Sequence, residues 1–321
     1  MKYIYCGKSG LQLPSISLGL WHNFGDAADY DTAKQIITYA FEQGITHFDL
    51  ANNYGPPSGA AETNFGKIWK ETLGSHRHQL IISSKAGHRA WDGPYGDGSS
   101  RKSLMASIDL SLKRTGLEYF DIFYSHRYDS STPVEETMQA LVDIVRSGKA
   151  LYIGLSKYPP STARKAMQYL ADRDVPCLII QDKYNMLHRK PEKELLPLCE
   201  ESGCGFIAFS PLAQGILTDK YLNGIPEHSR AADPDGFLKK EQVTEEWISK
   251  VKRLEKIAAQ RGQTIAQTAL AWILRDERVT SLIIGARDTR QLKDNLKALE
   301  RDSFSPEELA EIDTIFGETP L

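Results

Sequence analysis

Residues 101–156 read RKSLMASIDLSLKRTGLEYFDIFYSHRYDSSTPVEETMQALVDIVRSGKALYIGLS, and one pattern occurs twice within them. Residues 101–115 and 134–146 carry apolar side chains at intervals of three to four, which is typical of amphipathic helices. Residues 119–125 and 150–156 are short apolar runs that hardly alternate with polar residues, as buried parallel strands do. Helix and strand alternate along the segment, so it predicts an α/β fold with a parallel sheet.

The same alternation extends in both directions from this segment. Strand-like runs occur at residues 15–20, 45–50, 80–85, 119–125, 150–156, 178–183, 205–210 and 281–286. Helical patterns also occupy residues 31–43, 60–73 and 161–171, and Gly44, Gly74, Gly116 and Gly148 fit helix C-terminal caps. Eight strand–helix units favour a closed (β/α)8 TIM barrel over an open sheet, and we expect one domain over residues 1–321.

Two segments depart from this regularity. Residues 3–13 predict a short N-terminal hairpin around Lys8-Ser9-Gly10, which would plug the bottom of the barrel. Residues 213–244 form a long polar connection after strand seven. Connections of that length inside a compact domain are usually functional.

The composition argues against several classes of protein. The 321 residues are 41% hydrophobic and 25% charged, and their net charge of −3 argues against a nucleic-acid-binding protein. No apolar run approaches the roughly 20 residues that span a membrane, and the N-terminus shows no secretory signal. The cysteines form no CxxC pair, so we expect reduced packing residues, no metal site and a cytoplasmic location; they are Cys6, Cys177, Cys199 and Cys204.

In a barrel of this type, the chemistry lies at the C-terminal ends of the strands. Asp49, Lys85 and His126 end three consecutive predicted strands, so their side chains would point at one small volume. Taken singly, each has a structural explanation, as a turn cap, a solvated loop charge and a core histidine. Tyr54 lies in the loop after Asp49, which could return a phenol over the barrel mouth.

These four side chains fit the reduction of a carbonyl group. A tyrosine with a pKa near 10 is a poor acid at neutral pH, and a neighbouring lysine ammonium lowers that pKa. Asp49 can hold Lys85 in place, and His126 can donate a hydrogen bond to a carbonyl oxygen. Together they can protonate a developing alkoxide. The sequence shows no nucleophile or metal set, so a hydride donor is the partner that this chemistry lacks.

The segments that carry these residues resemble the aldo-keto reductase superfamily. The resemblance rests on Gly44-Ile45-Thr46-His47-Phe48-Asp49 through Tyr54-Gly55, on Lys85, and on His126-Arg127-Tyr128-Asp129, in that order. It covers almost the whole chain. Within the superfamily the sequence looks most like the branch of bacterial L-glyceraldehyde 3-phosphate reductases and potassium-channel β subunits.

The resemblance implies NADPH-dependent reduction of small aldehydes or ketones, such as glyceraldehyde 3-phosphate or methylglyoxal, with Tyr54 as the general acid. It also implies a cofactor site at Trp21, Asp49, Ser156, Lys157, Gln181, Phe209, Ser210, Leu212, Gln214, Lys220, Arg230, Gly285, Arg287, Gln291, Asp294 and Asn295. Arg287 would set the preference for NADPH. Lys157 stands where many family members have asparagine, so its contact with the cofactor would differ from theirs.

The loop at residues 87–101 follows Lys85 and suggests a pocket for a short polar substrate. Trp21, Tyr54, Arg89, Trp91, His126 and Arg127 are the expected substrate-binding residues. Aromatic walls suit a small carbon chain, and guanidinium groups suit an anionic tail. Alternatively, the arginines are exposed or paired with carboxylates. The resemblance also implies a homo-oligomer, of tetramer size or larger.

Other functions fit the sequence less well than reduction does. A glycosidase would need a carboxylate pair that the strand ends do not offer, and a Schiff-base aldolase could use Lys85 but would not explain Tyr54 and His126. The GxGxxA pattern that begins at Gly203 enters a strand, unlike a dinucleotide-binding fingerprint. The main alternative is a cofactor-sensing regulatory subunit like the channel β subunits. That branch has asparagine at the position of His126, which favours an enzyme here.

Overall fold

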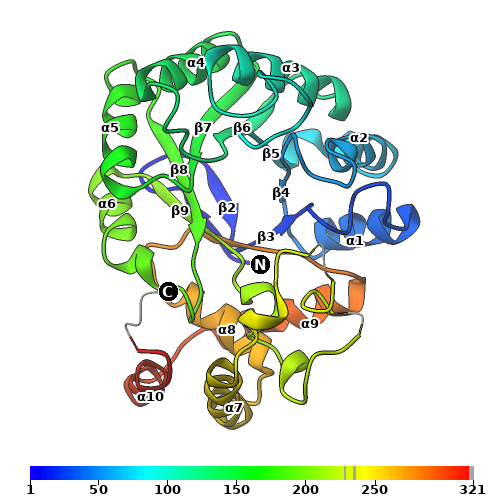
Figure 1. Cartoon of the computed structure of the whole chain (residues 1–321), viewed down its shortest axis with the longest axis vertical. Coiled ribbons are helices and arrows are strands. Elements are labelled where there is room, and N and C mark those ends of the chain that lie inside the picture. Colours follow the sequence, from blue (N-terminus) through cyan, green and yellow to red (C-terminus); the bar gives the residue numbers. More distant parts are fainter. Residues whose placement is uncertain (228, 234–235, 318–321) are drawn as a thin grey trace.

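The centre of the molecule is a closed barrel of eight parallel strands, seen in a computed structural model that describes residues 1–227, 229–233 and 236–317 (Figure 1). The barrel strands are β3 (Ile16–Gly19), β4 (His47–Asp49), β5 (Ile81–Ala86), β6 (Phe120–Ser125), β7 (Ala150–Ser156), β8 (Cys177–Lys183), β9 (Gly205–Phe209) and β10 (Ser281–Ile284). Each pairs in parallel with the next, and β10 closes the ring by pairing with β3. The predicted (β/α)8 barrel is confirmed, and every predicted strand overlaps an observed one.

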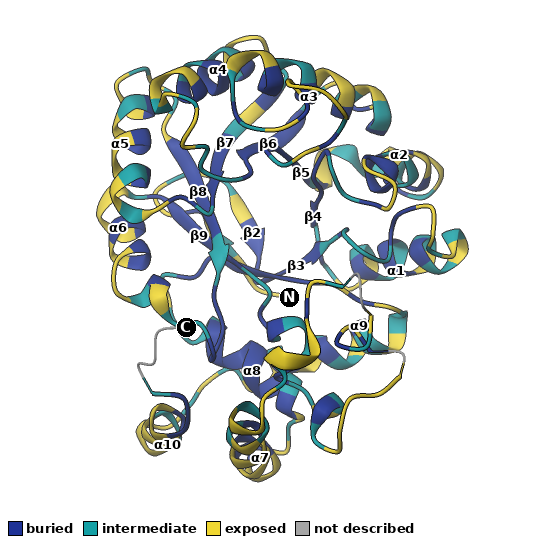
Figure 2. Cartoon of the chain, in the orientation of Figure 1, coloured by how far each residue is buried: buried dark blue, intermediate teal, exposed yellow. Residues whose placement is uncertain are grey.

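Helices surround the barrel and turn their apolar faces toward it (Figures 1 and 2). They are α1 (Tyr30–Glu42), α2 (Ala60–Thr72), α3 (Arg101–Thr115), α4 (Val134–Arg146), α5 (Pro160–Ala171), α6 (Leu195–Ser202), α7 (Glu245–Gln260), α8 (Ile265–Leu274), α9 (Thr289–Leu296) and α10 (Pro306–Phe316). Short 3-10 turns are η1 (Gly74–Gln79), η2 (Lys190–Glu192), η3 (Ala213–Gly215), η4 (Asp219–Tyr221), η5 (Lys240–Gln242) and η6 (Lys297–Glu300). Gly44, Gly116 and Gly148 have the positive φ expected after a helix. Gly74 does not, and instead begins η1, so that cap prediction was wrong.

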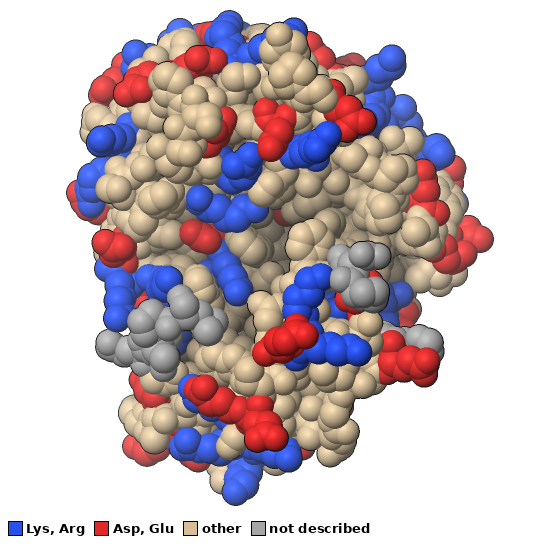
Figure 3. Space-filling model, in the orientation of Figure 1, with Lys and Arg blue, Asp and Glu red and all other residues tan. Residues whose placement is uncertain are grey.

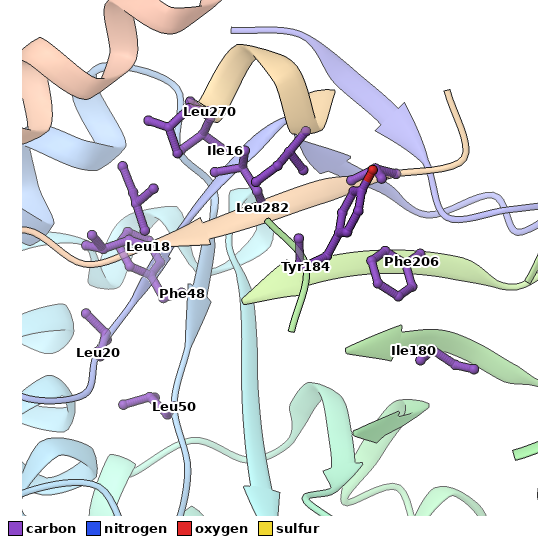
Figure 4. Packing of buried hydrophobic residues seen from close by; sticks show 14 of the residues in the cluster. Ile16, Leu18, Leu20, Phe48, Leu50, Ile180, Tyr184, Phe206, Leu270 and Leu282 are labelled. Carbon is purple, nitrogen blue, oxygen red and sulfur yellow. The ribbon is translucent and has the colours of Figure 1, made fainter. Parts of the chain in front are cut away.

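Apolar residues pack on both sides of the barrel wall. Outward-facing Ile16 and Leu282 meet Leu270 of α8 in the layer between barrel and helices (Figure 4). Inside, a second cluster joins strand residues such as Ile122 to Leu13 of the hairpin. That hairpin pairs β1 (Tyr3–Tyr5) with β2 (Gln12–Pro14) in antiparallel fashion, as predicted. Its contact with the interior cluster closes the barrel at the end opposite the strand C-termini, which leaves only the other end open to a ligand.

The connection after β9 is long and irregular, as expected. It contains η3, η4 and η5 and no longer helix among its described residues. The predicted cofactor-covering segment 224–230 lies within it, and His228 is outside the described residues. No helix in the described ranges combines the length and apolar character needed to cross a membrane.

Candidate active site

Lys85 and Asp49 form a buried ion pair at the C-terminal ends of β5 and β4. The Lys85 ammonium donates to Asp49 Oδ2 at 2.7 Å and to the Leu50 carbonyl at 2.6 Å. The Lys85 side chain is 0% exposed and that of Asp49 3%. An unpaired ammonium in such a place would cost several kcal/mol. Asp49 is therefore what allows a positive charge to be kept inside the barrel.

The Tyr54 ring lies next to this ammonium, and the His126 ring lies against Tyr54. Lys85 Nζ lies 4.9 Å from the centroid of the Tyr54 ring. The His126 ring meets the Tyr54 ring edge-on, with the centroids 5.8 Å apart. The structure thus brings the four predicted catalytic residues into one cluster at the barrel mouth.

The environment keeps both rings uncharged at neutral pH. Burial raises the pKa of Tyr54, and this outweighs the Lys85 ammonium, which lowers it. The lysine effect expected from the sequence is thus present, but it is the smaller one. Burial, followed by the Lys85 charge, holds the pKa of His126 well below its usual range. Burial alone would lower the pKa of Lys85, but Asp49 and Tyr54 raise it overall.

A chain of hydrogen bonds inside the barrel fixes the Asp49 carboxylate. Ser83 Oγ donates to Asp49 Oδ1 at 2.7 Å, so its oxygen must accept from His47 Nε2, 3.0 Å away. His47 Nδ1 then accepts from Ser17 Oγ at 2.9 Å, and Ser17 accepts from Ser281 at 2.7 Å. His47 is 0% exposed, and burial lowers its pKa to about 4. A neutral histidine with one fixed tautomer therefore orients the Asp49 carboxylate through Ser83.

The turn that carries Tyr54 is held by a second buried network. The Arg114 guanidinium of α3 donates to the Asn52 carbonyl at 2.9 Å and to Glu62 of α2 at 3.1 Å. Glu62 is fully buried and also accepts from Ser84 Oγ at 2.6 Å. Gly59 has φ +86°, and a Cβ there would lie 2.2 Å from the Arg114 guanidinium carbon. A glycine is therefore required where Arg114 passes the start of α2.

Several predicted cofactor residues lie beside the catalytic cluster. Gln181 Nε2 donates to Asp49 Oδ1 at 3.3 Å. Ser156 Oγ is buried and has no hydrogen-bond partner among the described residues. Phe209 ends β9, and Ser210 follows it with φ +52°. An orphaned buried hydroxyl and a half-buried aromatic ring at the same end of the barrel suit a polar ring system such as nicotinamide.

The remaining predicted cofactor residues gather near the ends of β9 and β10. Lys220 has a pKa lowered by burial and then by Arg287 and Arg230, so these three cations are close together. Leu212 directly precedes η3, Gln214 lies within it, and a Cβ at Gly285 would meet open space. Gln291 accepts from the Arg287 amide at 2.9 Å, Asp294 accepts from Gln267, and the amide nitrogen of Asn295 is buried without a described partner. Clustered cations and orphaned amides suit a phosphorylated ligand.

The predicted substrate residues are only partly brought together. Trp21 stacks at 5.8 Å on Tyr54 and joins the catalytic cluster. Arg127 donates to the Gly87 carbonyl and to Asp97, both at 2.9 Å. Arg89 pairs at 2.7 Å with Asp92 on the surface. Trp91 makes no ring contact with the cluster in the described part of the chain.

A comparison with protein families supplies the identification. The model described as "Aldo/keto reductase family" matches residues 15–316. The chain belongs to the aldo/keto reductase family. It is 54% identical over 317 residues to the L-glyceraldehyde 3-phosphate reductase of Escherichia coli O157:H7, covering 98% of this chain and 92% of the relative.

Two further relatives come from the channel branch. A putative voltage-gated potassium channel subunit beta of Schizosaccharomyces pombe is 38% identical, covering 99% of this chain and 94% of the relative. A probable subunit beta of Arabidopsis thaliana is 37% identical, covering 94% and 92%. The expected resemblance to both branches is confirmed. As an aldo/keto reductase, the protein is an oxidoreductase that works with a nicotinamide cofactor.

Sequence reasoning missed several residues at the mouth of this reductase. His88 directly follows Gly87 after β5, and its ring meets His126 edge-on at 4.5 Å. A strand-end argument carried three residues past Lys85 would have included it. Phe237, from the loop after β9, lies 4.8 Å from the Trp21 ring although it is 63% exposed. No local pattern predicts that contact.

Proposed function

We propose that this enzyme uses NADPH to reduce short aldehydes, with glyceraldehyde 3-phosphate as the main substrate and methylglyoxal also accepted. The observation that carries the proposal is the Asp49–Lys85 ion pair beneath Tyr54, with His126 at the edge of the same ring. The 54% identity to a reductase named for L-glyceraldehyde 3-phosphate supports the choice of substrate.

Each catalytic residue then has a distinct task. The neutral His126 donates a hydrogen bond to the carbonyl oxygen, and Tyr54 transfers its proton to that oxygen as it becomes an alkoxide. Tyr54 stays protonated until that moment because burial raises its pKa. Lys85 stabilises the phenolate that remains, and Asp49 orients Lys85. The products are a primary alcohol, NADP⁺ and a tyrosinate that regains its proton from water.

NADPH, when bound, supplies the hydride that reduces the carbonyl carbon. Ser156 and Gln181 would hold its carboxamide, Phe209 would stack on the nicotinamide, and Trp21, Asp49 and Lys157 would border it. The pyrophosphate and adenosine would bind Ser210, Leu212, Gln214, Lys220, Arg230, Gly285, Gln291, Asp294 and Asn295. Arg287, with a side chain 70% exposed, would meet the 2′-phosphate.

The substrate would lie between Trp21 and the loop after β5, which carries Arg89 and Trp91. Arg127 and Arg89 remain candidates for an anionic end, although Asp97 and Asp92 already pair with them. An arginine that leaves a surface carboxylate for a substrate phosphate loses little, because exposed pairs contribute only about 0–1 kcal/mol.

The test is NADPH oxidation with glyceraldehyde 3-phosphate, glyceraldehyde and methylglyoxal at matched concentrations. We expect steady turnover of all three and the highest kcat/KM for the phosphorylated aldehyde. Turnover without preference for the phosphate would make the protein a general aldehyde reductase. Tight NADPH binding without turnover of any aldehyde would instead support a cofactor-sensing regulatory subunit.

A further inference from the structure

The orientation of the His126 ring depends on packing. Its Nδ1 is buried and has no hydrogen-bond partner among the described residues, so only Nε2 is left to meet a substrate. A histidine that presents one ring nitrogen to a ligand is ordinarily oriented by a hydrogen bond at the other nitrogen. Without such a bond from the described residues, the direction of Nε2 is set by the side chains that pack against the ring.

Two rings meet His126 edge-on. The centroid of the Tyr54 ring lies 5.8 Å from that of His126, at an interplanar angle of 75°. The His88 ring is closer, at 4.5 Å and 86°. Both distances fall in the range of about 4.5–7 Å in which rings attract each other edge to face. Tyr54 is the proposed proton donor and belongs to the catalytic cluster, whereas His88 comes from the loop after β5 and contacts the cluster from outside.

The surroundings of His88 fix its protonation state. Lys157 Nζ lies 2.8 Å from His88 Nε2, and an ammonium only donates, so Nε2 accepts and the ring proton resides on Nδ1. Burial, followed by the charges of Lys157 and Arg127, lowers the pKa of His88 to about 4. His88 is therefore uncharged at neutral pH and is held in one tautomer. What it offers to His126 is the edge of a neutral ring.

A neutral ring suits this place because the barrel mouth is already positive. Lys and Arg side chains border the hollow at the centre of this face (Figure 3). Burial holds the pKa of His126 well below its usual range, and the nearby groups that act in the same direction are, in decreasing order, Lys85, Lys157, His88 and Arg127. Since His88 carries no charge at neutral pH, its part in this environment is the space that its ring fills.

We propose that His88 is a positioning residue that fixes the plane of the His126 ring, so that His126 Nε2 aims its hydrogen bond at the carbonyl oxygen of the substrate. This inference rests on the proposed reductase function. A proton on the buried Nδ1 of His126 would have no acceptor and would leave Nε2 without a hydrogen to donate, so the donor role requires the proton on Nε2. Removal of the His88 ring would open space in which the His126 ring turns and its proton changes nitrogen.

The experiment separates the ring of His88 from its hydrogen bond. It measures kcat and KM for glyceraldehyde 3-phosphate with saturating NADPH in wild-type, His88→Ala, His88→Phe and His88→Gln enzymes. Phenylalanine keeps a ring edge and loses the acceptor for Lys157, whereas glutamine keeps an acceptor and loses the ring. The control is His76→Ala, which removes a histidine ring that packs at 5.0 Å on Phe41, in η1 ahead of β5.

We expect His88→Ala and His88→Gln to lower kcat about 10–100-fold with little change in KM, since a misplacement of about 1 Å costs up to about 10²-fold. The His88→Phe variant should recover most of that loss, and His76→Ala should behave as the wild type. An unchanged kcat in His88→Ala would overturn the inference. So would a His88→Gln enzyme more active than His88→Phe, because the bond to Lys157 would then be what matters. A rise in KM alone would make His88 a substrate-binding residue instead.

A second readout needs no turnover. The ¹⁵N shifts of labelled histidines report which nitrogen of a neutral ring carries the proton. In the NADP⁺ complex, we expect His126 to carry its proton on Nε2 in the wild type and in His88→Phe, and to show shifts averaged over both tautomers in His88→Ala. The same shifts in all three proteins would contradict the role of His88. Absence of aldehyde reduction in the wild type would contradict the proposed function, while the tautomer of His126 would still test the inference.

Discussion

At the scale of single residues, the site depends on one charge that the protein keeps where water cannot reach it. Lys85 is fully buried, and Asp49 and Tyr54 together raise its pKa above the ordinary value despite burial. A proton donor with a raised pKa needs such a charge close by, because the phenolate left after proton transfer must be stabilised at once. We therefore expect the ammonium to matter more in the transition state than in the resting enzyme.

Lys85→Met is expected to lower kcat by about 10²–10⁴-fold, since it removes the charge that stabilises the phenolate. Asp49→Asn should be milder, because Asp49 acts on the substrate only through Lys85. Both effects are measured as kcat with saturating NADPH, with the cofactor Kd as a control. A Lys85→Met enzyme that keeps wild-type kcat would show that the ammonium has no part in proton transfer.

Arg287→Ala is expected to reduce the preference for NADPH over NADH. A guanidinium can bind a 2′-phosphate with two hydrogen bonds and gains little from a ribose hydroxyl. The Arg287 side chain is mostly exposed. Its contact with Asp288 is loose, with 3.6 Å between Nε and Oδ2, so the guanidinium is free to turn toward a phosphate. The measurement is the Kd of both cofactors for both proteins, with the neighbouring Arg290→Ala as control. Equal ratios in wild type and Arg287→Ala would refute the assignment.

At the scale of elements, the turn between β4 and α2 is positioned from outside. Its Tyr54 carbonyl accepts from the Gly59 and Ala61 amides at 2.9 and 3.2 Å, and Arg114 holds its Asn52 carbonyl. Glu62 is buried and needs Arg114 to offset its charge, since burial raises the pKa of that carboxyl. Tyr54, the proposed proton donor, is thus tied to α3, which follows α2 and β5 along the chain.

Arg114→Met is expected to cost about 3 kcal/mol of folding stability, because it leaves a buried carboxylate without its partner. It should also lower kcat more than it raises the KM for aldehyde, since Tyr54 shifts while the pocket remains. Arg114→Lys should restore part of both losses. The control is Arg164→Met, which breaks the exposed pair with Glu201 and should cost less than about 1 kcal/mol. Stability is measured as the urea midpoint of unfolding, and activity as steady-state kcat and KM. A loss of stability without a change in kcat would limit Arg114 to a structural role.

Elements whose ends depend on local sequence could be predicted residue by residue. The bounds of α3, α4 and β7 agree with the sequence prediction, because Gly116 and Gly148 mark helix ends through their own backbone preferences. The position of strand-end side chains such as Asp49 and Lys85 at the barrel mouth could be predicted from the topology alone. The Lys157–His88 bond and the Phe237–Trp21 contact could not be predicted, because they join loops whose paths are set by tertiary packing.

At the scale of the whole molecule, the barrel interior is polar just below the catalytic cluster and apolar at the hairpin end. Ser17, His47, Ser83 and Ser281 form the polar layer, and each is 0% exposed. The chain of hydrogen bonds that they form ends on Asp49. The stability of the barrel and the orientation of the Asp49 carboxylate therefore both depend on His47. A homo-oligomer, a single domain and a cytoplasmic location stay predictions from the sequence.

Stability is expected to fall on acidification because His47 is buried in its neutral form. Its pKa is about 4 in the folded protein against an ordinary value near 6.5. The contribution is fully present above pH 6.5 and is lost as pH falls through 4, by at most about 3 kcal/mol at 1.36 kcal/mol per pKa unit. The His47→Gln variant should be less stable than the wild type at pH 7. Its stability should fall less than that of the wild type between pH 7 and pH 4.5, as measured by urea unfolding. An equal fall in both proteins would contradict this role.

The central claim is that Tyr54 delivers the proton that completes reduction. Tyr54→Phe removes only the hydroxyl, keeps the ring that packs on Trp21, and leaves the cofactor residues in place. The decisive measurement is kcat for NADPH oxidation with glyceraldehyde 3-phosphate, together with the Kd of NADPH. The account predicts a loss of about 10²–10⁴-fold in kcat with nearly unchanged cofactor binding. A variant that retains more than about a tenth of the wild-type kcat would contradict it.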